Sequence, residues 1–497
     1  MGLTAGRSFR AGVLLCCVTM ATSVHADDLR GALEQAYASN PTLMSARAGL
    51  RATDEQVAIE KAAGRPNISS TGQYTEYVAR GANSFTSPER TFNASASLSV
   101  PIYEGGAVRN AVRAAETRVL AGQADLRGTE SSIFSQVVGA YMDVVQSEAI
   151  VGLNRNNVQV LDVNLRATRD RYEIGDLTRT DVAQSQSRLA VARSDSRSSE
   201  ANLASARETY IRLVGKPPVD LQPPPPLPNL PATPEDAVAV ALESNPDILA
   251  ARQRSKAADI GINSAGAGRL PRIDFFSSGA YNDYFGTLGG SSSSAFAQTD
   301  KSAQIGVRAS IPIYQGGRPA ALRRQAQERA GAALEDEIEV ERGVIAQVRA
   351  AYSSWTASQE IIASSQTAVD AASLSLEGVR AENSVGNRTI LDILNAEQEL
   401  LSAQVRLVTA RRNAYVAGFS LLAAMGRAEA RDLGLDGGAL YDPTVHYNRI
   451  KGSWFDWDDR PAPTARATRT ISTPVQDGNI PPEKVQSTEA QRNAPAR

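Results

Sequence analysis

Cysteine is almost absent from this 497-residue chain, which contains only Cys16 and Cys17. Both lie in a short apolar run (residues 11–18) that follows two arginines and precedes the small-residue sequence VHA, a pattern typical of a secretory signal peptide. We therefore predict a signal peptide over residues 1–26. The mature chain would then lack cysteine, which excludes disulfides and thiolate metal sites.

Histidine is equally scarce, and His446 is the one histidine that follows the predicted signal peptide. A catalytic or metal centre needs partner side chains around its histidine, and the sequence shows no clustered nucleophile and base. We therefore predict no enzymatic activity, no metal and no cofactor, and a packing or surface role for His446.

Aromatic residues make up 5% of the chain, its net charge is −2, and no apolar run of 18 or more residues follows the signal. A net charge of −2 gives no excess of basic residues of the kind that binds nucleic acid. The lack of a long apolar run excludes a membrane-spanning helix. Long tracts rich in alanine, serine, glutamine and arginine suit extended helices packed in a thin layer.

What the chain does have is an internal repeat. VPIYEGG begins at residue 100 and IPIYQGG at residue 311, which is 211 positions later. At the same offset, EIGDLTRTDVAQSQ (173–186) corresponds to SVGNRTILDILNAE (384–397). The sequence SNP also occurs once before each PIY motif, at 39–41 and at 244–246. The whole domain is therefore duplicated.

Each half follows the same predicted plan. Two extended segments form a hairpin, and a long helical hairpin follows. The first repeat is expected over 27–214, with strands at about 68–80 and 91–103 and a helical hairpin at about 105–214. A proline-rich linker over 215–234 leads to a second repeat over 235–427, with strands at about 272–285 and 302–314 and a helical hairpin at about 316–426. A further segment over 428–460 and a disordered tail over 461–497 follow.

The segments 92–103 and 303–314 alternate strictly between apolar and small or polar residues. Such a period of two predicts strands with one apolar and one polar face. Strands in lipid must close into a barrel, because an open edge leaves backbone groups unsatisfied. Barrels need at least about eight strands, so four strands predict that several copies share one barrel.

The motif PIY-x-GG marks the expected change from strand to helix, where a pair of glycines frees the backbone. The junction residues are Pro101, Gly105, Gly106, Pro312, Gly316 and Gly317. Beyond the junction, Phe134, Val137, Tyr141, Val144 and Glu148 recur at three- and four-residue steps, as in a coiled-coil seam.

TRTD (178–181) and TILD (389–392) both fit the capping box that opens a helix. Arg388 and Asp392 are also four residues apart and could pair along one helix. Capping alone and a functional role, with or without capping, both remain open for these residues.

The segment SVGNRTILDILNAEQELLSAQ (384–404), both PIY-x-GG junctions, both SNP segments and LLAAMG (421–426) closely resemble the TolC family of outer-membrane channel proteins. The branch that serves type I secretion and multidrug efflux is the most similar, and the resemblance covers about residues 28–426. It implies a mixed α and β membrane protein that forms a homotrimer. Its twelve-stranded β-barrel would stand on an α-helical periplasmic tunnel. The linker over 215–234 and the region over 428–460 would form a belt around the middle of this tunnel.

The resemblance also implies a passive exit duct in the outer membrane. Its partners would be a periplasmic membrane-fusion adaptor, an inner-membrane ABC or proton-driven transporter, and outer-membrane lipid. The turns at 173–179 and 384–389, with Gly175 and Gly386, would form the closed tip that meets the adaptor. Matching the family's gate by position gives Thr180, Asp181, Arg388, Asp392 and Asn395. Asn395 stands where some relatives have an acid, and Asn383 stands where a latch tyrosine can occur.

A second interpretation of the pattern is a soluble periplasmic coiled-coil scaffold or adaptor-like binding protein, whose strands pack on its own helices. The segment WFDWDD (454–459) either contacts a partner or packs on the belt.

Overall fold

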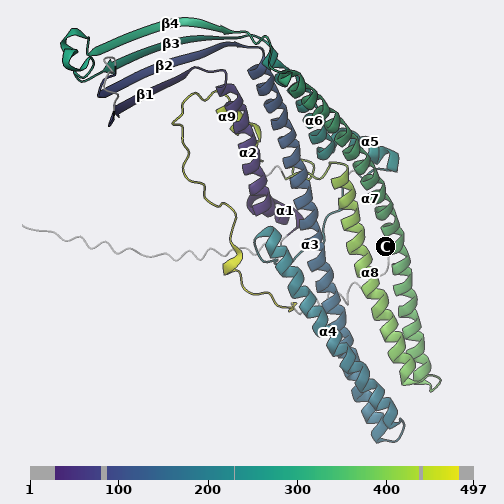
Figure 1. Ribbon diagram of the computed structural model, residues 1–497. Helices are drawn as coiled ribbons and strands as arrows, with labels where there is room; N and C mark the ends of the chain where they lie inside the picture. The colour runs from purple at the N-terminus through teal and green to yellow at the C-terminus, as the bar shows by residue number, and fades with distance from the viewer. Residues whose placement is uncertain (1–27, 80–86, 229, 436–439, 481–497) are drawn as a thin grey trace, which may run out of the picture.

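The computed structural model describes residues 28–79, 87–228, 230–435 and 440–480. The predicted signal peptide and the end of the tail lie outside these residues. The described chain is elongated, with one curved sheet at one end and helices that run away from it (Figure 1). Within the described ranges, no helix combines the length and the apolar character needed to cross a bilayer.

The two repeats have the same order of elements. The first contains α1 (Leu29–Ser39), α2 (Pro41–Ala62), β1 (Asn67–Glu76), β2 (Arg90–Glu104), α3 (Ala107–Glu173) and α4 (Arg179–Val214). The second contains α5 (Pro234–Ser244), α6 (Pro246–Gly266), β3 (Arg272–Asp283), β4 (Thr299–Ser310), α7 (Arg318–Ser384) and α8 (Ile390–Ala424). The short helix α9 (Thr444–Ile450) follows, and short 3₁₀ turns lie at Ala267–Arg269, Gly290–Ala295 and Thr470–Ser472.

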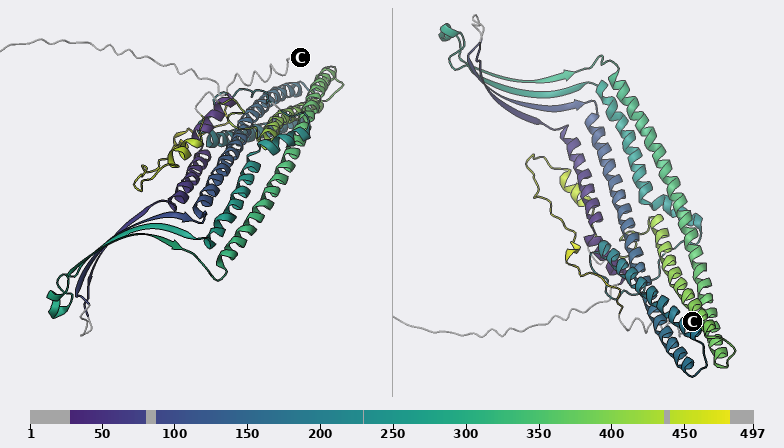
Figure 2. Two further views of the ribbon diagram at one scale, coloured as in Figure 1. Left: turned by 90° about the horizontal axis from the view of Figure 1, so that it is seen from above. Right: turned by 60° about the horizontal axis from the view of Figure 1, so that its bottom comes forward.

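The helices form a wall of four columns that continues the four strands (Figure 2). Helices α3 and α7 each run the full length. Near the sheet, α3 packs with α2 and α6, and α7 packs with α6. Near the far end, α3 packs with α4 and α8, and α7 packs with α8. The order of columns is therefore α2 with α4, then α3, then α6 with α8, and finally α7.

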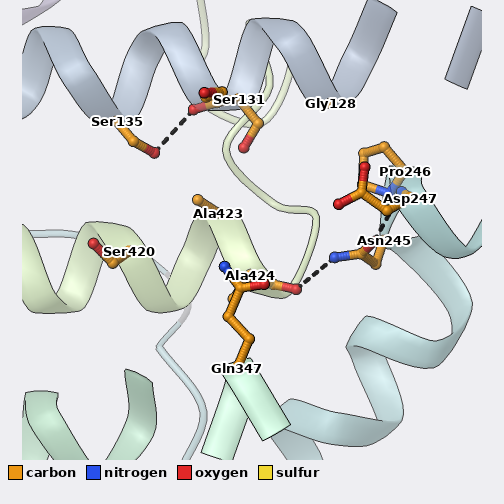
Figure 3. A pocket seen from close by; sticks show the side chains of 11 residues that line it. Gly128, Ser131, Ser135, Asn245, Pro246, Asp247, Gln347, Ser420, Ala423 and Ala424 are labelled. Carbon is orange, nitrogen blue, oxygen red and sulfur yellow. Dashed lines mark hydrogen bonds between the residues drawn. The ribbon is translucent and has the colours of Figure 1, made fainter. Parts of the chain in front are cut away.

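In each repeat, the asparagine of the SNP motif links the start of the helix near the sheet (α2 or α6) to the end of the helix that returns from the tip (α4 or α8). Asn40 caps α2 with its side-chain oxygen, and its Nδ2 donates to the carbonyl of Leu213 near the end of α4 (2.9 Å). Asn245 caps α6 in the same way and donates to the carbonyl of Ala424 at the end of α8 (2.8 Å; Figure 3). One amide thus satisfies free groups at two helix ends. A pocket of about 280 Å³ lies beside the second joint, lined mainly by small residues of α3 and α8.

The four strands form one antiparallel sheet in the order β1-β2-β3-β4. Its register separates two faces. Directly opposite residues share a face, and the apolar side carries Ile68 opposite Leu98, Val100 opposite Phe275 and Phe275 opposite Val307. On the other side, Ser69 bonds Ser97 (2.8 Å), Thr71 bonds Ser95 (2.8 Å) and Gln304 bonds Ser278 (2.9 Å).

The strand ends differ from the predicted ones. β1 stops at Glu76, before the expected residue 80, which lies outside the described residues. β4 runs over Thr299–Ser310, so it begins three residues earlier and ends four residues earlier than expected. Pro312 therefore lies beyond its strand, whereas Pro101 lies in β2 at a register shift. Proline has no N–H for the ladder, which explains both the shift and the early end.

The proline-rich linker over 215–234 is held by tyrosine hydroxyls. Tyr141 of α3 donates to the carbonyl of Gln222 (2.6 Å), Tyr352 of α7 to that of Ala232 (2.7 Å) and Tyr415 of α8 to that of Pro225 (3.1 Å). The expected seam is also present: Phe134, Val137, Tyr141 and Val144 are fully buried, and Glu148 pairs with Arg207 (3.0 Å).

The segment after α8 lies against the first repeat. On α9, His446 is buried and its Nδ1 lies 2.8 Å from the Asp54 carboxylate of α2, so it is a packing residue. Burial raises the pKa of Asp54, and the hydrogen bond with His446 lowers it by a smaller amount.

The tail also follows a defined path as far as Ile480, contrary to the disorder expected from residue 461. Arg207 donates to the carbonyls of Asp477 (2.9 Å) and Asn479 (3.0 Å), which fixes this stretch on α4.

Candidate functional site

The candidate site is the tip of the two long helical hairpins, at the end of the molecule away from the sheet (Figure 1). The chain reverses between Glu173 and Arg179 in the first hairpin, and between Ser384 and Ile390 in the second. The two turns share one backbone pattern. Gly175 N donates to Tyr172 O and Gly386 N donates to Asn383 O, each at 3.0 Å.

Gly175 and Gly386 both adopt φ of +84°. This left-handed conformation is open to glycine and strained for other residues. A Cβ atom at either position would meet no heavy atom within 4 Å. Backbone conformation, rather than space, therefore restricts these two positions.

A capping box opens each return helix, as the T-x-x-D motifs predicted. Thr178 and Asp181 exchange hydrogen bonds at the start of α4, and Thr389 and Asp392 do so at the start of α8. Hydrogen bonds from the backbone N–H (2.9 Å) and hydroxyl (2.8 Å) of Thr389 lower the pKa of Asp392. Thr180 is exposed in the first turn of α4.

Arg388 pairs with Glu382 and not with Asp392, although the four-residue spacing allowed the second pairing. Arg388 precedes the cap, and its Nε lies 2.6 Å from Glu382 Oε2, near the end of α7. This hydrogen bond raises the pKa of Arg388. The first turn has the reverse arrangement, because Arg171 on the outgoing helix pairs with Asp176 in the turn (2.6 Å). The side chain of Asn383 also braces the second turn by donating to the Arg388 carbonyl (2.7 Å).

Two polar links near the tip join the first hairpin to the second, in addition to those between α3 and α8 further from the tip. Asn395 of α8 accepts a hydrogen bond from Arg188 of α4 (2.8 Å). Two residues further on, Glu397 accepts from Arg380 of α7 (2.7 Å) and from Asn164 of α3 (3.2 Å). Its side chain is only 5% exposed, so it is a buried carboxylate that joins three helices.

An apolar contact supports these links. Leu394 of α8 is buried among residues of the first hairpin, namely Leu161, Leu165, Leu189 and Ala192. Asn395 was predicted from its position in the motif, whereas Glu397 and its partners were not predicted. No local signal marks a contact between residues 233 positions apart.

The glycine pairs of the two strand–helix junctions share one geometry. Gly105 and Gly106 have φ of +62° and +80°, and Gly316 and Gly317 have +59° and +79°. A Cβ atom at Gly105 would lie 2.7 Å from Leu270 Cβ, so this position also lacks room.

In the part of the chain that the structure describes, no group of three or more histidine, cysteine or acidic side chains could hold a metal ion. The tip is built from the two braced turns and the polar links between the hairpins.

The sequence matches the family described as "Outer membrane efflux protein" over residues 32–216 and 237–427. It is 38% identical to outer membrane efflux protein BepC of Brucella suis over 429 residues, which cover 86% of this chain and 91% of BepC. It is 26% identical to outer membrane protein TolC of Escherichia coli, with 92% of this chain and 95% of TolC covered.

The fold agrees with solved structures of such channels. A CusC structure superimposes with a TM-score of 0.70 at 20% identity, covering 80% of this chain and 92% of CusC. The outer membrane protein VceC of Vibrio cholerae gives 0.68 at 22% identity, covering 80% of this chain and 96% of VceC. These two findings concern the fold alone.

The resemblance to TolC proteins, the mixed α and β channel fold and the outer-membrane location are thus confirmed, and the soluble scaffold is set aside. The chain belongs to the outer membrane efflux protein family and is an outer-membrane exit duct for export and efflux in a Gram-negative bacterium.

Proposed function

We propose that three copies of this chain share one twelve-stranded barrel above a helical tunnel, and that the hairpin tips form its periplasmic gate. The duct is passive: an inner-membrane ABC or proton-driven transporter supplies the energy. A periplasmic membrane-fusion adaptor connects the two and contacts the turns at Gly175 and Gly386.

The open edges of the sheet carry the proposal. In the described sheet, β1 and β4 each have a strand on one side only. An exposed strand edge in hydrocarbon leaves backbone groups without partners, at several kcal/mol for each group. Pairing β1 of one copy with β4 of the next removes every such edge once the ring closes.

The two faces of the sheet suit this arrangement. The ten residues of β1 extend about 33 Å at ~3.3 Å per residue, which matches a hydrocarbon layer of ~30 Å. The apolar face with Ile68, Val307 and Ile305, all well exposed in one chain, would meet lipid. The face with the serine and threonine pairs would line a wet lumen.

The helices give a second argument for neighbouring copies. Both α3 and α7 have 67 residues, but α3 lies inside the wall and α7 at its margin. Apolar side chains of α7 are accordingly exposed at Leu334, Ile361 and Leu374. The α2 and α4 column of the next copy would cover them.

The gate is proposed from the tip geometry. Three copies of Asp392 around the axis would repel one another and concentrate cations there. The links of Glu397 and Asn395 hold the two hairpins of each chain together, so the tip opens when adaptor contacts outweigh them. Thr180, Asp181 and Arg388 lie at the same end and shape that surface.

Disulfide trapping tests the shared barrel. Ser69 of β1 and Gln304 of β4 both lie on the polar face near the two open edges, so the double variant Ser69→Cys/Gln304→Cys should cross-link between copies. Covalent trimers should appear on denaturing gels. If moving the β4 cysteine in steps of two residues, which keep it on the polar face, also yields only monomers, the proposal is wrong.

A matched control uses neighbours within one chain. Ser69 and Ser97 lie opposite each other with their hydroxyls 2.8 Å apart. Ser69→Cys/Ser97→Cys should therefore form a disulfide inside each chain and no covalent trimer.

A further inference from the structure

Three large aromatic side chains project from the segment that follows α9. Trp454, Phe455 and Trp457 are 62%, 83% and 91% exposed. Single exposed apolar residues are normal, but three within four positions form a patch that needs an explanation.

The patch is fixed at the end of the strands. α9 packs on α2 and α3, where Tyr447 donates to Glu116 of α3 (3.2 Å). The Arg65 guanidinium then donates to the Ser453 carbonyl and lies 4.5 Å from the centre of the Trp454 ring. Arg65 is two residues before Asn67, the first residue of β1, so Trp454 lies where the sheet begins.

This level coincides with a boundary of the hydrocarbon layer, because β1 is just long enough to cross it. Proteins place tryptophan and tyrosine at such boundaries. Here Tyr103 of β2 and Tyr314 beyond β4 are exposed at this end of the sheet. β1 begins with Asn-Ile-Ser and has no aromatic residue at this end. The patch lies beside β1 and supplies the aromatic side chains that this strand lacks.

Charges around the patch indicate the kind of surface it meets. The segment over 449–460 contains three basic residues and three acidic ones: Arg449, Lys451, Arg460, Asp456, Asp458 and Asp459. A balanced set gains nothing from an anionic surface. It suits a zwitterionic headgroup layer, where phosphates face the basic groups and ammonium groups face the carboxylates.

We propose that Trp454, Phe455 and Trp457 insert into the headgroup layer of the periplasmic leaflet and bind zwitterionic phospholipid. The C-terminal segment thus supplies β1 with its part of the aromatic girdle and ties the belt to the membrane. This inference rests on the proposed barrel, in which the apolar face of the sheet meets lipid.

Tryptophan fluorescence in the full-length protein tests the contact. The third tryptophan, Trp355, is removed by Trp355→Phe, and the protein is reconstituted in brominated phosphatidylcholine. Bromine near the headgroup end of the acyl chain should quench Trp454 and Trp457 more than bromine near the terminal methyl. Addition of an anionic phospholipid should leave the quenching unchanged.

Two reference variants separate this inference from the barrel. In a chain with Trp355, Trp454 and Trp457 all changed to Phe, Ile305→Trp places a probe on the apolar face and Gln304→Trp one on the polar face. The barrel predicts strong quenching of the first, with deep bromine more effective, and little of the second.

Each result is decisive. If Ile305→Trp is quenched and Trp454 and Trp457 are not, the headgroup contact is refuted and the barrel stands. If none of these tryptophans is quenched, both fail. Quenching that depends on anionic lipid would overturn the assignment to a zwitterionic surface.

Discussion

The buried carboxylate of Glu397 should be a main determinant of tip closure, and Glu397→Ala is the variant that tests this. The change removes the acceptor shared by Arg380 and Asn164. Breaking a fully buried ion pair costs ~3–5 kcal/mol. The Arg380 side chain is 50% exposed, so it regains water and most of that penalty disappears.

The remaining cost has two sources. The Asn164 amide loses its hydrogen-bond acceptor, and Arg380 loses part of its charge pairing. An unsatisfied partly buried polar group costs ~1–3 kcal/mol. We therefore expect a loss of about 2 kcal/mol per chain, which is a factor of about 30 in the equilibrium between joined and separated hairpins. Glu397→Gln should lose less, because the amide oxygen still accepts from Asn164.

Single-channel recording in planar bilayers measures this effect as open probability and conductance. Glu397→Ala should open more often than the unchanged protein, while Glu399→Ala, an exposed acid two residues away, should not. A Glu397→Ala channel that stays closed as long as the parent protein, or a Glu399→Ala channel that opens equally, would refute the reasoning.

Three further predictions follow from the turns and the linker. Gly386→Ala should destabilise its turn by ~1–2 kcal/mol because φ is positive, whereas Gly139→Ala within α3 should be neutral or stabilising; hydrogen exchange of the turn amides would show equal protection in both variants if this is wrong. Asp392 has a lowered pKa in the folded protein. Its cap therefore stabilises α8 fully above the ordinary carboxyl pKa of about 4, and this contribution is lost as the pH falls through the lower folded value. Exchange at the start of α8 should rise in that acidic range, and Thr389→Ala should remove most of the pH dependence; a persistent dependence would contradict the assignment. Tyr141→Phe should cost ~1 kcal/mol and make the linker easier to cleave with protease, whereas an unchanged cleavage rate would show that the hydroxyl does not hold it.

The parts of the fold that depend on local pattern were predictable from sequence. Alternation in 92–103 fixes the apolar and polar faces, and the structure places Ile68 and Phe275 on the same side as Leu98 and Val100. The capping boxes were equally clear, because T-x-x-D satisfies backbone groups within one turn.

Contacts between distant elements were not predictable. Spacing allowed Asp392 as the partner of Arg388, whereas the turn brings Glu382 closer. The cluster at Glu397 unites residues of three helices. The path of the tail depends on Arg207, a residue of α4 that nothing near residue 480 identifies.

The proline-rich linker has a mechanical consequence. Its prolines carry no N–H, so its carbonyls need outside donors, and tyrosines from α3, α7 and α8 provide them. An extended proline run is already near its full reach of ~3.1 Å per residue and has little slack. The three tyrosines fix the linker to the first hairpin through α3 and to the second through α7 and α8. A relative movement of the two hairpins at this level must therefore stretch the linker or break one of these hydrogen bonds, so we expect the hairpins to move mainly beyond it, toward the tip.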